Sequence, residues 1–133
     1  MSKSKLACVL LVDDDEIANF IHQSFLEEVK IADQIVTAQN GLEALQLIQE
    51  GKINTDEKPT LVLLDINMPV MNGYEFLDAF RDLDPEKKQL FKIVVLSSSN
   101  NTTDVDKAYQ KGAIDYLNKP LEKAKVNALV DRI

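Results

Sequence analysis

Short apolar runs alternate along the chain with segments in which apolar residues recur every three or four positions. The first pattern is typical of buried β-strands, and the second is typical of helices with one buried face. The predicted strands are residues 6–12, 34–38, 61–65, 92–97 and 114–118. The predicted helices are residues 17–29, 41–50, 73–83, 103–111 and 121–133, with Asp84 and Pro85 ending the third. The pattern therefore predicts five successive β-α units.

Each predicted helix has an apolar stripe that we expect to face the sheet. The stripes, in chain order, are Ile17, Phe20, Ile21 and Phe25; Leu42, Leu45 and Ile48; Phe76, Leu77 and Phe80; Val105, Ala108 and Tyr109; and Val126, Leu129, Val130 and Ile133. His22 falls beside the stripe of the first helix, and we expect it to be a solvated surface side chain.

The first, third and fourth strands are apolar at nearly every position, which favours central parallel strands covered by helices on both faces. Five β-α units of this length predict a flavodoxin-like doubly wound α/β fold. Its five-stranded parallel sheet has strand order 2-1-3-4-5, with five helices on the two faces. We expect a single domain over residues 1–133, with a polar tail at residues 1–5. In this order the ends of strands one and three are neighbours and form the place where ligands bind.

Five polar residues follow the ends of the apolar runs: Asp13, Asp14, Asp65, Ser97 and Lys119. Because the carboxyl ends of parallel strands meet at one edge of the sheet, these side chains are expected to converge. Three carboxylates, a hydroxyl and an ammonium group can bind a divalent cation and a phosphoryl group. The alternative for the acidic run is helix capping, and we assign that role to Asp15.

Composition restricts the setting of this site. The 133 residues are 45% hydrophobic, enough for one good core, and the net charge of −7 argues against direct binding to nucleic acid. The single cysteine, Cys8, lies inside an apolar run, which excludes a disulfide framework and indicates a core residue in a reducing compartment. The apolar run that follows the polar start is too short for a signal peptide or a membrane span. We therefore expect a soluble cytoplasmic protein.

Three motifs in this order resemble the receiver domain of bacterial response regulators of two-component systems. They are Val12-Asp13-Asp14-Asp15, the loop Asp-Ile-Asn-Met-Pro-Val-Met-Asn-Gly at residues 65–73, and Lys119-Pro120, with Ser97 between the last two. The similarity spans almost the whole chain and is strongest to stand-alone receivers of the chemotaxis-regulator type. It implies a phosphorylation-dependent signalling switch rather than an enzyme, apart from self-catalysed phosphoryl transfer to and hydrolysis from one aspartate.

The resemblance implies a role for each site residue. Asp65 is the phosphoacceptor that forms an aspartyl phosphate. Mg²⁺, for which Mn²⁺ can substitute, is held by Asp14, Asp65, the Asn67 backbone carbonyl and, through a water, Asp13. The remaining roles are phosphoryl binding by Ser97, the Ser98 backbone N–H and Lys119; switching by Ser97 and Tyr116; a turn at Pro120; and tuning of dephosphorylation by Asn67 and Ser99.

The same resemblance implies partners. The phosphoryl donor is a sensor histidine kinase or a histidine phosphotransfer protein, docking beside the first helix. A downstream protein is expected on the face formed by the fourth helix, the fifth strand and the closing helix.

Three alternatives stay open at this point. A haloacid-dehalogenase-type phosphatase would also use an aspartate nucleophile, but it needs an acid two positions later, where this chain has Asn67. A phosphate sink or a phosphorylation-independent binding module would keep the fold without switching. The chain is also compatible with a fragment of a larger regulator whose output domain follows Ile133.

Overall fold

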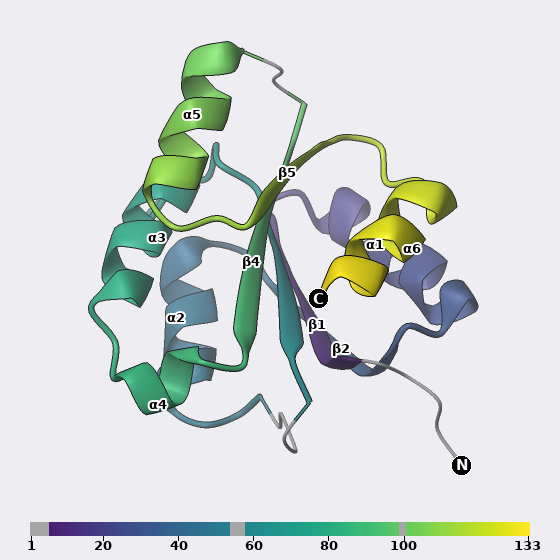
Figure 1. Ribbon diagram of the computed structural model, residues 1–133, viewed down its shortest axis with the longest axis horizontal. Helices are drawn as coiled ribbons and strands as arrows, with labels where there is room; N and C mark the ends of the chain where they lie inside the picture. The colour runs from purple at the N-terminus through teal and green to yellow at the C-terminus, as the bar shows by residue number, and fades with distance from the viewer. Residues whose placement is uncertain (1–5, 54–57, 99–100) are drawn as a thin grey trace.

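The computed structural model describes residues 6–53, 58–98 and 101–133 (Figure 1). Its elements, in chain order, are β1 (Leu6–Val12), α1 (Glu16–Val29), β2 (Ala32–Ala38), α2 (Gly41–Gln49), β3 (Thr60–Leu64), α3 (Gly73–Arg81), α4 (Pro85–Lys88), β4 (Phe91–Ser97), α5 (Thr102–Gln110), β5 (Asp115–Asn118) and α6 (Lys123–Arg132). The strands form one parallel sheet in the order β2-β1-β3-β4-β5. The predicted fold class and strand order are confirmed.

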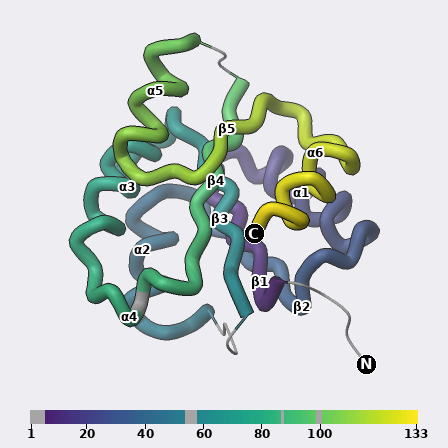
Figure 2. The backbone as a smooth tube through the Cα atoms, viewed as in Figure 1, coloured from purple at the N-terminus to yellow at the C-terminus, as the bar shows by residue number. Residues whose placement is uncertain are grey.

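The central strands are buried on both faces, and alternate residues belong to different cores. Leu10 and Val62 pack with α2 and α3, whereas Val9 and Leu61 pack with α1 and α6. Figure 2 shows these two layers on opposite sides of the sheet, with α5 beside α3. Successive residues of a strand point to opposite faces of the sheet. Because both faces of β1 and β3 are covered by helices, these strands are apolar at every position or nearly so.

The rotation of α1 differs from the prediction. Ile17, Phe20 and Ile21 are 71%, 70% and 56% exposed, and the buried stripe is instead Asn19, His22 and Leu26. Asn19 fixes this rotation, because its Nδ2 donates to the Asp13 carbonyl oxygen at 2.9 Å and reaches the Ala38 carbonyl oxygen at 3.5 Å. Ile17, Phe20 and Ile21 therefore face away from the sheet, whereas Leu26 lies in the core.

Other helix predictions hold with local corrections. Phe76, Leu77, Val126, Leu129 and Val130 are buried as predicted. Leu42 was expected inward but is 40% exposed. Tyr109 is also exposed, because its hydroxyl donates to Asp115 Oδ1 at 3.1 Å at the edge of the sheet.

The segment after α3 forms the single-turn helix α4, which is not among the five predicted helices. Asp84 and Pro85, expected to end the third helix, begin α4, since the Asp84 carboxylate accepts the Glu86 N–H at 3.2 Å and proline is favoured in a first turn. In the part of the chain that the structure describes, no helix is long and apolar enough to span a membrane.

Candidate functional site

The ends of β1 and β3 hold three carboxylates together. The Asp13 N–H donates to the Ala38 carbonyl and the Asp65 N–H donates to the Val12 carbonyl, so the sheet's own hydrogen bonds place both residues. One carboxylate oxygen each from Asp13, Asp14 and Asp65 lies within 4.8 Å of the others. Asp13 is buried and Asp14 is exposed. Such a cluster of hard oxygen donors suits a small divalent cation.

Lys119 brings the positive charge that the site needs. Its backbone N–H donates to the Ser97 carbonyl at 2.9 Å, which extends the pairing of β4 and β5 to the site. Its Nζ lies 2.8 Å from Asp13 Oδ2 and 3.9 Å from Asp65 Oδ2. Burial alone would lower the pKa of Lys119, but the hydrogen bond with Asp13 and the charges of Asp65 and Asp13 outweigh burial and raise it. Lys119 is therefore a permanent cation beside Asp65.

Asp65 is the carboxylate with the most perturbed protonation. Burial raises its pKa to about 6, with further increases from the negative charges of Asp13 and Asp14, while Lys119 and the Ile66 N–H oppose the shift. That N–H donates to Asp65 Oδ1 at 2.9 Å. A strongly perturbed carboxyl with named charge partners is a hallmark of a functional site. At neutral pH most of Asp65 is still ionised and can act as a nucleophile.

The start of α1 holds Asp13 in place. Asp15 caps the helix by accepting the N–H groups of Ile17 and Ala18, as predicted, and its own N–H donates to Asp13 Oδ1 at 3.0 Å. The sequence analysis did not single out Asn19, whose side-chain amide donates a hydrogen bond to the Asp13 carbonyl oxygen. Asn19 lies three positions before His22 and seven before Leu26, so the three residues share one side of the helix. That spacing is the signal in the sequence that could have identified Asn19 as buried.

His22 was predicted to be solvated, and that prediction is wrong, since it is only 7% exposed. The rotation of α1 that buries Asn19 buries His22 as well, because the two lie one turn apart. Burial lowers the pKa of His22, and the positive charge of Lys119 lowers it further against the opposing effects of Asp13 and Asp15. A buried neutral imidazole does not suit a phosphoryl carrier.

The loop after Asp65 is tightly constrained. A Cβ added to Gly73 would lie 2.7 Å from the Asp65 carbonyl oxygen, so only glycine fits there without movement. Val70 has a φ of 69°, and the Met71 N–H donates across it to the Pro69 carbonyl at 2.7 Å. A branched residue in the left-handed region is strained, and such strain gathers at functional sites.

The remaining predicted residues lie around the same end of the sheet. Ser97 is buried at the end of β4, Ser98 and Asn67 are exposed, and Lys119-Pro120 is a cis peptide. Tyr116 is half-buried and packs on the cluster that contains Val95 and Ala108. Ser99 lies outside the described residues.

Magnesium at this site is expected to stabilise the fold, because it would relieve repulsion among the three carboxylates. At about ten times its dissociation constant, a ligand that binds only the folded state adds about 1.4 kcal/mol, or about 3–5 °C in melting temperature. Asp14→Ala should shrink this response, whereas Asp33→Ala, remote from the cluster, should keep it. Thermal melts in EDTA and in millimolar Mg²⁺ provide the measurement, and a wild type without any shift would contradict the metal site.

Comparisons with known proteins show the family of the chain. The family model of the response regulator receiver domain matches residues 9–131. The chain is 34% identical over 119 residues to the chemotaxis protein CheY of Halobacterium salinarum, covering 89% of this chain and 88% of that protein. It is 30% identical over 124 residues to the probable C4-dicarboxylate response regulator DctR of Bacillus subtilis, covering 93% of this chain but only 50% of DctR.

Solved structures give the same result. A two-component response regulator from Cytophaga hutchinsonii superposes with a TM-score of 0.83 at 31% identity, covering 96% of each chain. The Saccharomyces cerevisiae complex of the histidine phosphotransfer protein Ypd1 with the receiver domain of Ssk1 matches with a TM-score of 0.77 at 29% identity, covering 96% of this chain and 88% of that one.

Proposed function

This chain belongs to the response regulator receiver domain family, and we propose that it is a switch that accepts a phosphoryl group on Asp65 in a Mg²⁺-dependent reaction. The observation that carries the proposal is that Asp65 lies next to both a carboxylate cluster and a lysine. One of its oxygens is within 4.8 Å of those of Asp13 and Asp14, and Lys119 Nζ is 3.9 Å from its Oδ2. The three carboxylates can thus hold a divalent cation, and Lys119 already places one positive charge beside Asp65.

The proposed reaction is a direct displacement at phosphorus. A carboxylate oxygen of Asp65 attacks, a new P–O bond forms, the P–N bond of a donor phosphohistidine breaks, and the donor imidazole leaves. Asp14, Asp65 and the Asn67 carbonyl would hold Mg²⁺, with Asp13 acting through a water, and the cation would neutralise charge on the phosphoryl oxygens. Mn²⁺ offers the same coordination chemistry.

The chain's own groups supply the other half of the charge balance. Lys119 is held at the site by Asp13 and would turn its ammonium to a phosphoryl oxygen. The Ser97 hydroxyl and the Ser98 N–H would donate to the remaining oxygens. The only covalent chemistry proposed is this self-catalysed transfer and the later hydrolysis, with Asn67 and Ser99 tuning access of water to the phosphate. A phosphatase function is disfavoured because Asn67 cannot act as an acid.

The exposed apolar side of α1 supports docking of the phosphoryl donor there. Ile17, Phe20 and Ile21 form a continuous helical stripe that the sheet does not cover, and an uncovered apolar stripe is typical of a protein interface. The helix begins next to the site, since Asp15 is its cap. A histidine kinase or a phosphotransfer protein that packs a helix on this stripe would bring its histidine toward Asp65. We place this exchange in the cytoplasm.

Phe20→Ser is expected to slow phosphoryl transfer from a protein donor but not from acetyl phosphate. A buried aromatic contact at an interface commonly contributes more than about 1 kcal/mol, so a fivefold or larger loss is expected with phosphorylated Ypd1 as the donor. Because acetyl phosphate needs no docking surface, it controls for damage to the site. Tyr109→Ser, an exposed aromatic on α5, is the matched control. Equal slowing with both donors, or none with Ypd1, would contradict docking on α1.

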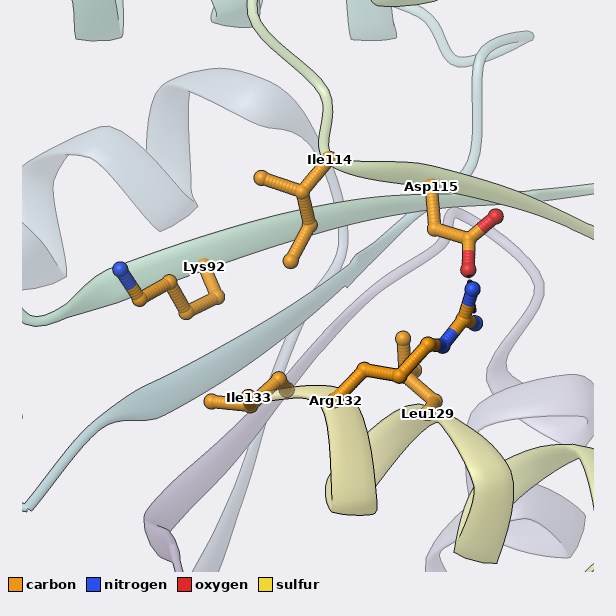
Figure 3. Close-up of a pocket in the computed structure, with 6 residues that line it drawn as sticks. All are labelled: Lys92, Ile114, Asp115, Leu129, Arg132 and Ile133. Carbon is orange, nitrogen blue, oxygen red and sulfur yellow. Dashed lines mark hydrogen bonds and ion pairs between the residues drawn. The ribbon is translucent and has the colours of Figure 1, made fainter.

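The output surface is proposed on α5, β5 and α6. Ser97 ends β4 just before this region, and Tyr116 lies on β5. Asp115 of β5 joins the other two elements, because it accepts the Tyr109 hydroxyl of α5 and pairs with Arg132 of α6 (Figure 3). Movement of Ser97 toward a phosphoryl group would open space for Tyr116 to turn inward, which shifts an existing two-state equilibrium. A downstream protein would read the resulting surface.

Beryllofluoride, whose tetrahedral group mimics a phosphoryl group on Asp65, is expected to shift amide resonances well beyond the site. With Mg²⁺ present, changes should reach α5 and Tyr116. Ser97→Ala should shrink these distant changes because it removes the hydroxyl that senses the anion, while leaving magnesium binding intact. Ser98→Ala keeps its N–H and serves as the control. Changes confined to the neighbours of Asp65 would favour a phosphate sink over a switch.

A further inference from the structure

A positively charged groove runs between α3 and α5 on the face of the sheet that α1 and α6 do not cover. It consists of two adjoining cavities of about 290 Å³ and 630 Å³, and both are lined by Arg81, Gln110 and Lys111. Lys88 adds a cation to the first cavity and Lys107 adds one to the second. We call this feature the α3–α5 groove. In Figure 1 these two helices lie side by side.

Charge in this groove opposes the charge of the protein. Four cations line it with one carboxylate, Asp106, whereas the whole chain carries −7. Asp78 lies next to Lys111, so the local balance remains positive even when Asp78 is included. Because screening limits the reach of distant charges to about 8–10 Å, a short ligand in the groove experiences mainly the charges of the groove itself and little of the acidic remainder of the chain.

Internal contacts hold the cations in place but leave donors for a ligand. Lys111 Nζ binds both Asp78 oxygens at 2.8 and 2.9 Å, and Lys88 Nζ donates to the Arg81 carbonyl at 2.7 Å. Lys107 Nζ sits 4.2 Å from the centre of the Tyr74 ring. The Arg81 side chain is 59% exposed and reaches Asp78 only at 3.4 Å. Arg81 therefore has most of its guanidinium donors directed to solvent.

The smaller cavity has an apolar lining beneath the cations. Leu77 and Ile93 are buried, and Phe80 and Gly112 complete this part of the wall. Binding pockets for whole small molecules usually range from about 300 to 1,000 Å³, so 290 Å³ is enough for one large side chain rather than a complete ligand. The wider cavity, with Arg81, Lys107 and Lys111, continues from it as a polar shelf.

We propose that the α3–α5 groove binds a short acidic segment of a partner protein, with one large apolar side chain inserted over Leu77 and Ile93 and flanking carboxylates on Arg81 and Lys107. The site is separate from Asp65, because Ile93 lies near the start of β4 whereas Asp65 follows the end of β3. Binding here needs no phosphorylation and does not rest on the proposed phosphoryl chemistry. A long nucleic acid is disfavoured because it would extend over the acidic remainder of the surface.

Three synthetic peptides test this proposal. The first has a central Leu-Phe pair with two glutamates on each side; the second replaces the glutamates with glutamines; the third replaces Leu-Phe with Ser-Ser. The first should shift the amide resonances of Leu77, Gln110 and Gly112 in the full chain, and its binding should weaken as salt is raised. The second and third should bind at least about tenfold more weakly.

Variants of the protein complete the experiment. Arg81→Glu should weaken binding of the first peptide about tenfold or more. Lys52→Glu makes the same charge change at an exposed lysine outside the groove and should change binding less than twofold. If Arg81→Glu impairs folding in thermal melts, Arg81→Gln replaces it, with a smaller loss expected. No shifts in the groove, equal binding of the glutamine peptide, or equal effects of the Arg81 and Lys52 variants would overturn the proposal. A single-stranded oligonucleotide that shifts the same amides at lower concentration would also overturn it.

Discussion

Asp65→Asn is expected to abolish formation of the phosphoryl adduct from acetyl phosphate, with no detectable product where the wild type is labelled in magnesium. The substitution keeps the size and shape of the side chain, and its amide oxygen can still accept the Ile66 N–H. What it removes is the anionic oxygen that must attack phosphorus. Loss of a nucleophile removes the reaction pathway itself, so the effect is far larger than the loss of a single binding contact.

The measurement for this variant is intact mass after incubation with acetyl phosphate and Mg²⁺. Asp33→Asn changes an exposed aspartate on β2 in the same way and should be labelled like the wild type. Labelling of Asp65→Asn at the wild-type rate would mean that another residue accepts the phosphoryl group.

The same substitution is expected to stabilise the metal-free protein at neutral pH by about 3 kcal/mol, since one pKa unit corresponds to about 1.4 kcal/mol. The folded protein holds the Asp65 proton with a pKa of about 6, against an ordinary value of 3.8. Because the folded state binds this proton more tightly, the contribution of Asp65 to stability is greatest below pH 4. It falls as the pH rises from about 4 to about 6 and stays low above that range.

Urea unfolding in EDTA at pH 4, 5 and 7 measures this effect as a difference between variant and wild type. The difference should be small at pH 4, where Asp65 is protonated in the folded wild type and still partly protonated in the unfolded wild type, and should grow toward pH 7. Saturating Mg²⁺ should reduce it, because the cation stabilises the wild-type carboxylate. An equal difference at all three pH values would show that the pKa of Asp65 is not raised in the folded protein.

The sheet and the charged site could be predicted from sequence because both follow from the positions of the apolar strands along the chain. Apolar runs such as that of β1 fix which segments are central, and the polar residue after each run then lies at one edge of the sheet. Asp13, Asp65 and Lys119 were found in this way without knowledge of any contact. The geometry that brings Lys119 Nζ to 2.8 Å from Asp13 needed the structure, since the two residues are far apart in the chain.

The helix surfaces were harder to predict because apolar stripes can serve partners as well as the core. In α1 the stripe of Ile17, Phe20 and Ile21 is exposed, and a polar residue, Asn19, sets which side faces the sheet. Periodicity detects a stripe but cannot tell whether it faces the core or a partner. His22 was misplaced for the same reason. The error coincides with the surface that we propose for donor docking.

The turn at α4 illustrates a different limit. An aspartate followed by a proline is compatible with the end of one helix or with the start of another. Proline is excluded from helix interiors but favoured in a first turn. Asp84 and Pro85 serve the second purpose. A four-residue helix gives too few positions for any periodicity to appear.

Mapping the modified residue in the wild-type protein tests the central claim most directly. After labelling with acetyl phosphate and Mg²⁺, hydroxylamine attacks an acyl phosphate and leaves a stable hydroxamate, which proteolysis and mass spectrometry can assign to one residue. The account predicts a hydroxamate at Asp65 alone, formed only when Mg²⁺ is present during labelling. A modification elsewhere, or labelling that proceeds equally in EDTA, would contradict it.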